Sequence, residues 1–146
     1  MRVQLLDDST GWLGDMLSGG VSEGAVLAAC DLPPDWRSVE ERLVEAFHVA
    51  RRCAAQGAPL VYVVHSADLR GMRSVLASTL ATAVVSCARA VAFEFQREGV
   101  AANVVAIPDD VDHESSARVI EGLLRDPVLT GELVDLGNAK LGNLQP

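Results

Sequence analysis

The chain has 146 residues, of which 49% are hydrophobic and 22% are charged, so it can form one domain around one core. Aromatic residues make up only 4%, so the core must consist mainly of Val, Leu and Ala, which suits helices packed on a sheet in the α/β class. The net charge of −8 argues against nucleic acid as a partner, because attraction to phosphates needs a positive surface.

Cysteine usage and hydropathy indicate a cytoplasmic protein. Cys30, Cys53 and Cys87 are widely spaced and odd in number, which is typical of reduced thiols and not of a disulfide framework or a metal site. No basic start followed by an apolar run opens the chain, so we expect no signal peptide. The most apolar segment is interrupted by polar residues such as Ser78 and Arg89, which argues against a membrane span.

Short strands and helices alternate in the first part of the chain. Residues 2–6 alternate weakly like a strand, a short helix reaches Leu17, and residues 24–29 are a second apolar strand. The segment from Ser38 to Glu41 fits the capping box that starts a helix. Apolar residues then recur every three or four positions until Gly57, which ends this helix.

The second part of the chain continues the alternation. The predicted elements are a strand at 60–64, a helix at about 74–96, a strand at 100–107, a helix at about 114–125 and a strand at 132–136. A strand, helix and strand of this size form one crossover unit of a parallel sheet. The helix at 74–96 is apolar almost all round, so we expect the sheet to cover one side and another subunit to cover another.

These elements predict a single α/β domain over residues 1–137, followed by a polar tail at 138–146. The expected architecture is a Rossmann-like parallel sheet of about five strands, with helices in two or three layers.

Four segments carry a resemblance to a known family. They are residues 59–66 (PLVYVVHS), 89–95 (RAVAFEF), 99–108 (GVAANVVAIP) and 129–132 (LTGE). In order and spacing they resemble the serine strand, the end of the active-site helix, the G-I-R-V-N-x-V-x-P-G segment and the I-T-G-Q segment of short-chain dehydrogenases/reductases. The similarity is to the carboxyl-terminal half of 3-oxoacyl-acyl-carrier-protein reductases, and it implies a Rossmann-like fold.

The acid–base pair of that family does not carry over. The family needs Tyr-x-x-x-Lys on the long helix, where the tyrosine transfers a proton and the lysine lowers the tyrosine's pKa. Counted back from Gly99 by the family's spacing, the tyrosine position is Ala77 and the lysine position is Ala81. The only tyrosine, Tyr62, lies in a predicted strand, and the only lysine, Lys140, lies in the tail. The resemblance therefore implies a catalytically degenerate member.

The serine is the one catalytic position that is kept, and the cofactor turn is not intact. The supporting asparagine of the family falls at about Arg42, while Ser66 stands at the serine position. Residues 10–14 replace the T-G-x-x-x-G-x-G turn that cradles a pyrophosphate, and the bulky Trp12 lies among them. The segment before Ser38 is too short for a full βαβαβ half. We therefore expect no bound cofactor and a truncated dinucleotide-binding half.

The first functional hypothesis is a pseudoenzyme that works by association. Members of the family pair through helices that correspond here to residues 39–55 and 74–96, and through the last strand. This chain is expected to pair with itself or with a full-length, active ketoreductase that acts on carrier-bound or CoA-bound acyl chains. We also expect that the missing helices leave strand surface at 25–27 and 60–64 poorly covered, and such patches mark interfaces.

The alternatives use the residual cleft. A cofactor-independent isomerase, cyclase or hydrolase, or a small-ligand binding module, would use Ser66, Arg42 and Asp109. His65 and Ser66 are adjacent at a strand end and should point to opposite faces, which does not favour a nucleophile–base pair.

The acidic stretch after the strand at 100–107 and the two tryptophans each allow two interpretations. The acidic stretch from Asp109 to Asp112 is typical of a helix start and lacks the ligand spacing of a metal site. Trp12 and Trp36 are either partner anchors or core residues.

Overall fold

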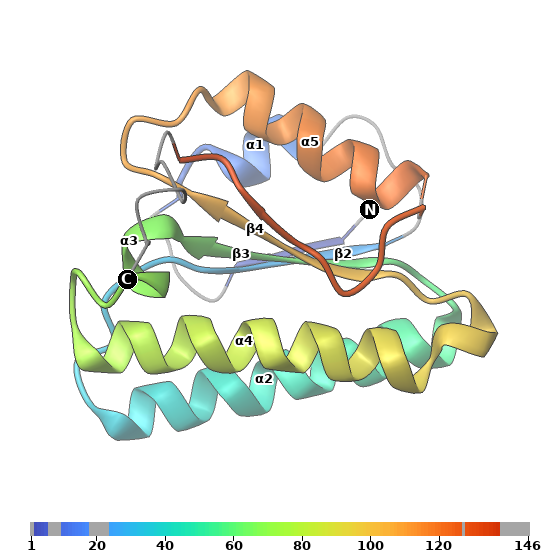
Figure 1. Ribbon diagram of the computed structural model, residues 1–146, viewed down its shortest axis with the longest axis horizontal. Helices are drawn as coiled ribbons and strands as arrows, with labels where there is room; N and C mark the ends of the chain where they lie inside the picture. The colour runs from blue at the N-terminus through green and yellow to red at the C-terminus, as the bar shows by residue number, and fades with distance from the viewer. Residues whose placement is uncertain (1, 6–9, 18–23, 127, 138–146) are drawn as a thin grey trace, which may run out of the picture.

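A parallel β-sheet forms the centre of the molecule (Figure 1). The computed structural model describes residues 2–5, 10–17, 24–126 and 128–137. Its five strands are β1 (Arg2–Leu5), β2 (Ala25–Ala29), β3 (Leu60–His65), β4 (Ala102–Ile107) and β5 (Leu133–Asp135). Their spatial order is β1-β2-β3-β4-β5, with every neighbouring pair parallel. The prediction of an α/β fold with about five parallel strands is confirmed.

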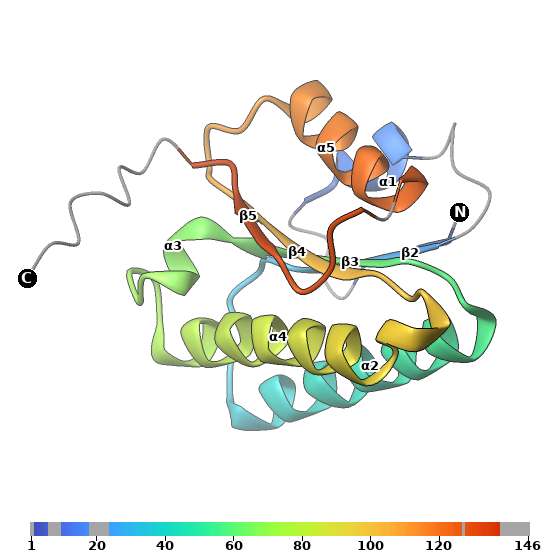
Figure 2. The same cartoon turned by 45° about the vertical axis from the view of Figure 1, so that its right-hand side comes forward.

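Helices cover both faces of this sheet, so the molecule has three layers (Figures 1 and 2). They are α1 (Leu13–Leu17), α2 (Trp36–Gln56), α3 (Ser66–Leu69), α4 (Val75–Glu94) and α5 (His113–Arg125), with a short 3₁₀ turn at Gln96–Glu98. The two long helices α2 and α4 lie side by side on one face, and α1 and α5 lie on the other. The predicted tail, 138–146, lies outside the described residues.

Side-chain caps set the starts of the long helices. The capping-box prediction for Ser38 is wrong, because α2 starts earlier and its N-cap is Asp35. The Asp35 carboxylate accepts hydrogen bonds from the backbone N–H and the hydroxyl of Ser38, both at 2.8 Å. Gly57 ends α2 as predicted, at a φ of 63° that favours glycine. Ser74 caps α4 by accepting from the N–H of Ala77 at 3.0 Å.

The core has one part on each face of the sheet. Alternate residues of the strands point to opposite faces, so Leu27 and Tyr62 face α2 and α4, whereas Val26 and Val61 face α1 and α5. The strands β2 and β3 are covered on both faces, because every residue in them is buried. The prediction of exposed strand surface at 25–27 and 60–64 is therefore wrong. Its physical reason is α1, which has only five residues but contributes two fully buried leucines, Leu13 and Leu17.

The strand order and the placement of the helices produce both right-handed and left-handed crossover connections between the parallel strands. The strands advance in one direction from β1 to β5, while the connecting helices lie on opposite faces in pairs. Connections that advance in the same direction over opposite faces have opposite hand. In Figure 1 the connections through α2 and α4 are right-handed, as nearly all such units are, so those through α1 and α5 are left-handed.

Helix α4 is the one helix of the described residues that is long and apolar enough, by length and composition, to cross a membrane. Core helices of soluble proteins pass the same test, and α4 packs here against the sheet and α2. Eight of its residues are buried: Ala77, Leu80, Ala81, Val84, Val85, Ala88, Val91 and Ala92. Its place in the fold is that of a core helix.

Candidate functional site

Polar side chains gather at the carboxyl ends of the strands, where parallel α/β sheets hold their ligands. Ser66 follows β3 and starts α3, and its hydroxyl donates a hydrogen bond to the carboxylate of Asp135 at 2.7 Å. Asp135 ends β5 and also accepts from the guanidinium of Arg70 at 2.9 Å. Ser66 thus joins the edge strand to α3 and is 2% exposed.

His65 has a different partner and a fixed tautomer. Its Nδ1 accepts a hydrogen bond from the N–H of Ala67 at 3.1 Å, so the ring proton is on Nε2. Nε2–H then donates to the carboxylate of Asp109 at 2.9 Å. With both ring nitrogens engaged and its own partner distinct from that of Ser66, His65 is not placed to act as a base for the serine.

A buried ion pair lies between α3 and α4. The Asp68 carboxylate is 1% exposed and accepts two hydrogen bonds from the guanidinium of Arg73, at 2.7 and 2.6 Å. Arg73 also donates to the carbonyl of Cys30, just after β2. The hydrogen bonds that Arg73 donates to Asp68 raise the pKa of Arg73, so this guanidinium stays charged. The pair ties the ends of β2 and β3 together.

Arg42 does not join Ser66 or Asp109. Its guanidinium forms a two-pronged ion pair with the carboxylate of Asp31, directly beyond β2, with one contact at 2.8 Å. The predicted grouping of Ser66, Arg42 and Asp109 is therefore wrong, since each side chain has a different partner.

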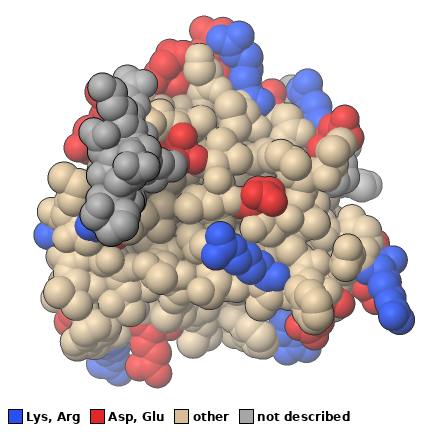
Figure 3. All heavy atoms as spheres, in the orientation of Figure 1, with Lys and Arg blue, Asp and Glu red and all other residues tan. Residues whose placement is uncertain are grey.

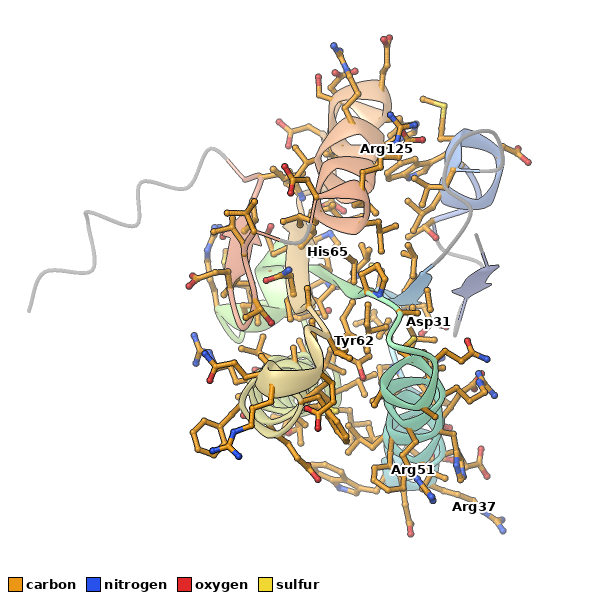
Figure 4. The ribbon with its side chains drawn as sticks, turned by 90° about the vertical axis from the view of Figure 1, so that its right-hand side faces the viewer. Asp31, Arg37, Arg51, Tyr62, His65 and Arg125 are labelled. Atoms are coloured by element: carbon orange, nitrogen blue, oxygen red, sulfur yellow. The ribbon has the colours of Figure 1, made fainter. Side chains whose placement is uncertain are left out.

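The two alanines at the positions that the resemblance assigns to the tyrosine and lysine lie inside the core. Ala77 and Ala81 are 2% and 1% exposed, on the side of α4 that faces the sheet. Tyr62 is fully buried, and its hydroxyl donates to the carbonyl of Ala46 at 3.0 Å (Figure 4). Burial raises the pKa of Tyr62 far above its usual value, so this phenol does not fit the role of a proton donor at neutral pH. Lys140 lies outside the described residues.

The described amino-terminal residues do not fit a dinucleotide. A pyrophosphate needs close approach of backbone amides at a helix start. Here α1 has five residues, and Trp12 beside its start stacks on His113 of α5 with ring centroids 4.2 Å apart. The strand order of the described sheet also does not reverse, unlike that of the doubly wound sheets that bind dinucleotides.

The acidic loop after β4 serves as a helix start, as predicted. Asp112 is the N-cap of α5 and accepts from the N–H of Ser115 at 3.0 Å. Hydrogen bonds from Ser115 hold the pKa of Asp112 below its usual value. Among the described residues no group of three His, Cys, Asp or Glu side chains could hold a metal ion. That the protein binds no metal stays a prediction.

Large apolar side chains are exposed on the outer side of the two long helices. We define the α2–α4 face by Trp36, Val44 and Phe47 of α2 and Val75 and Phe93 of α4, which are 50 to 85% exposed. A groove with a volume of about 540 Å³ lies between the helices; it is lined by Trp36, Val39, Glu40, Leu43, Val44, Phe47 and Thr79. Trp36 is therefore not a core residue. Charged side chains are sparse over α4 in the view of Figure 3.

Sequence reasoning missed the partners that engage the polar residues. Asp31, Asp68, Arg70, Arg73 and Asp135 all form ion pairs at the carboxyl edge of the sheet. The signal was their position, because each follows or ends a predicted strand. Which carboxylate meets which guanidinium depends on the order of the strands, and this is not visible in the sequence.

Comparison with solved structures shows the fold of short-chain dehydrogenases/reductases. The chain superposes on an oxidoreductase of that family from Burkholderia thailandensis with a TM-score of 0.65 at 18% identity, covering 89% of this chain and 70% of that one. It superposes on 3-hydroxyacyl-CoA dehydrogenase type-2 from Mycobacterium avium with a TM-score of 0.64 at 16% identity, covering 78% and 65%. It superposes on BdcA from E. coli with a TM-score of 0.61 at 17% identity, covering 90% of this chain and 68% of that one.

The chain thus spans about two thirds of the length of these proteins. No protein-family model and no curated protein matches the sequence. The comparisons therefore support a Rossmann-like fold shared with these oxidoreductases.

Proposed function

We propose that this chain is a non-catalytic, truncated relative of the short-chain dehydrogenases/reductases that works as an association subunit. It pairs with itself or with a full-length subunit of that family through α2, α4 and β5. The observation that carries the proposal is the α2–α4 face, where large apolar side chains such as Phe47 and Phe93 lie exposed on regular, well-packed helices. Exposed apolar patches of this kind mark interaction surfaces.

Loss of the reaction centre supports a non-catalytic role. The tyrosine and lysine positions are buried alanines, Ala77 and Ala81, and the kept serine is bound to Asp135. The polar groups around Ser66 are held in ion pairs within the chain. This geometry does not favour the alternative of a cofactor-independent enzyme or a binding module at Ser66.

The hand of the first connection supports internal truncation. In a doubly wound sheet of order 3-2-1-4-5-6, the helix after the first strand leads away from the fourth strand, and a later connection returns on the other face. If the second and third strands are removed, that first helix must lead directly to the fourth strand while keeping its own face. The result is a left-handed connection, as seen for β1, α1 and β2.

The partner class follows from the resemblance. One similar structure is a 3-hydroxyacyl-CoA dehydrogenase, and the sequence resembles reductases of carrier-bound acyl chains. A full-length partner of this kind would act on a CoA-bound or carrier-bound acyl substrate, while this chain contributes contact surface. None of the three cysteines forms a disulfide within the described residues, which fits a reducing compartment, so we place this assembly in the cytoplasm.

Substitution of Phe47 by glutamate tests the association. Phe47→Glu places a charge at the centre of the α2–α4 face, where the ring is 53% exposed, and it should raise the dissociation constant of the complex by about a hundredfold, as for an interface hot spot. Met16→Glu is the control, because Met16 is exposed on α1, on the opposite side of the sheet. Sedimentation velocity measures both, and equal behaviour of the two variants contradicts the proposal.

Titration with NADPH tests the non-catalytic part separately. Fluorescence of the bound nicotinamide should show no saturable binding to the wild-type chain, because the described start of α1 does not fit a pyrophosphate. Saturable binding together with reduction of a ketone would overturn this part of the proposal.

A further inference from the structure

The groove between α2 and α4, which we call the α2–α4 groove, carries a single formal charge. Five of its seven lining residues are apolar, and only Glu40 is charged. Thr79 donates its hydroxyl proton to its own helix at 2.8 Å. Glu40 is exposed and forms no ion pair among the described residues, since the nearby Arg37 pairs with Glu41 and points away from α4 (Figure 4). The groove therefore combines apolar walls with one unpaired carboxylate.

This carboxylate lies at one end of the α2–α4 groove. Trp36 and Glu40 are four residues apart near the start of α2, and side chains at this spacing are neighbours on a helix surface. Val44 and Phe47 continue the groove along the following turns. A positive group beside Glu40 can therefore also contact the Trp36 ring, and a cation over an indole face is attracted by the ring.

The two ends of the α2–α4 groove differ in charge. Beside Trp36, the N-cap residue Asp35 adds a second carboxylate, and hydrogen bonds within the cap hold the pKa of Asp35 below its usual value. At the other end, the guanidinium of Arg51 lies 5.8 Å from the centre of the Phe47 ring. No lysine or arginine among the described residues lines the groove itself. This distribution favours a bound cation at the Trp36 end and an uncharged body at the Phe47 end.

We infer that the α2–α4 groove binds an amphiphilic organic cation, a single alkyl chain that ends in a primary or quaternary ammonium group. The ammonium lies between Glu40 and the Trp36 ring, and the alkyl chain lies along Val44 and Phe47. The volume of about 540 Å³ is within the range of small-molecule sites. Burial of the alkyl chain supplies most of the affinity, and the carboxylate and the indole supply the selectivity for a positive charge.

The bound cation also bears on association, because the groove is part of the α2–α4 face. A cation in the groove and a subunit on the face exclude each other, so the ligand should weaken pairing. Only this competition rests on the proposed function, whereas binding of the cation to the single chain does not.

Titration with three surfactants of equal chain length tests the charge selectivity. The probes are decyltrimethylammonium, decyl maltoside and decanoate, each below its critical micelle concentration. In the Trp12→Phe background Trp36 is the only tryptophan, and its emission reports cover of the half-exposed ring in a chain dilute enough to be monomeric. The cation should bind about tenfold more tightly than the anion, because an exposed ion pair and a cation–π contact each contribute up to several-fold.

Glu40→Gln and Glu41→Gln form a matched pair of variants. Both remove one carboxylate from neighbouring exposed positions of α2, but only Glu40 lines the α2–α4 groove. Glu40→Gln should weaken binding of decyltrimethylammonium about threefold or more and should not weaken binding of decanoate, whereas Glu41→Gln should behave as wild type. Circular dichroism checks that both variants fold. Equal affinity for all three probes, no saturable binding, or equal losses in the two variants would overturn the inference.

The outcomes separate this inference from the proposed function. A chain that associates neither with itself nor with a full-length reductase, yet selects the cation, supports the site and contradicts the proposed function. A chain that associates but does not select the cation contradicts the site alone. Where both hold, saturating decyltrimethylammonium should shift the sedimentation coefficient towards that of one chain, and an unchanged coefficient would overturn the competition.

Discussion

Each polar side chain at the carboxyl edge has a partner that defines its role. Ser66 resembles a catalytic serine in sequence, yet its hydroxyl is bound to Asp135, a residue 69 positions away. A resemblance can predict that a serine stands at the end of a strand, and this was confirmed. It could not predict the partner, because Asp135 reaches Ser66 only after β4 and β5 have taken their places in the sheet.

Removal of the Ser66 hydroxyl should therefore affect stability. Ser66→Ala takes a hydrogen bond from the nearly buried Asp135 carboxylate and should lower the free energy of unfolding by about 1.5–3 kcal/mol, the range for hydrogen bonds to charged groups. Urea denaturation measures the change, and the exposed Ser86→Ala should change it by less than about 0.5 kcal/mol. Equal stability of Ser66→Ala and wild type would show that the serine has no such structural role.

Introducing the tyrosine and lysine of the similar reductases should not create their reaction in this chain. Ala77→Tyr with Ala81→Lys forces a ring and a charged amine into positions that are 2% and 1% exposed. Overpacking alone costs about 1–3 kcal/mol, and a buried unpaired charge adds to it. We expect a clearly lower urea midpoint and no NADPH-dependent reduction of a ketone, whereas Glu94→Tyr on the exposed side should be nearly neutral. A stable, active double variant would contradict the placement of these alanines in the core.

Helices and strands were predictable where the apolar repeat is long. Helix ends and short helices were harder to predict, because they depend on single residues. The apolar repeat predicted α2 and α4. The motif at Ser38 predicted the wrong N-cap for α2, because Asp35, three residues earlier, is the N-cap and accepts the backbone N–H of Ser38. The four-residue helix α3 is absent from the predicted elements, because it is too short for any repeat. The five-residue α1 was predicted as a short helix, yet the sequence did not predict that it covers one face of the sheet.

The caps make part of the stability depend on pH. Hydrogen bonds from Ser38 and Ser115 hold the pKa values of Asp35 and Asp112 below the usual 3.8. Their contribution is therefore fully present above pH 3.8 and is lost as the pH falls through the lower pKa of the folded state.

The variant Asp35→Ala with Asp112→Ala should be less stable than wild type at neutral pH. The difference should shrink on acidification, because the wild type loses its caps there too. Urea denaturation across the acidic range measures both proteins. A gap that stays constant down to pH 2 would show that these carboxylates do not stabilise through their charged form.

The whole molecule combines a well-packed core with a surface on which large apolar side chains are exposed. Composition and alternation predicted the α/β class, which the sheet and its similar structures confirm. They could not predict that α1 and α5 complete the second face, so the expected exposed surface was assigned to the sheet. In the structure the exposed apolar surface lies instead on the outer side of α2 and α4, where Phe47 and Phe93 are not covered by other described residues. The surface proposed for association thus lies on helices whose inner sides are already well packed.

The molar mass of the wild-type chain in solution tests this account most directly. Light scattering over a range of concentrations should approach twice the 15.4 kDa of one chain, and Phe47→Glu should return it to the mass of one chain while Met16→Glu should not. A mass of one chain at every concentration, unchanged when a full-length reductase is added, would contradict the claim that the α2–α4 face exists for association.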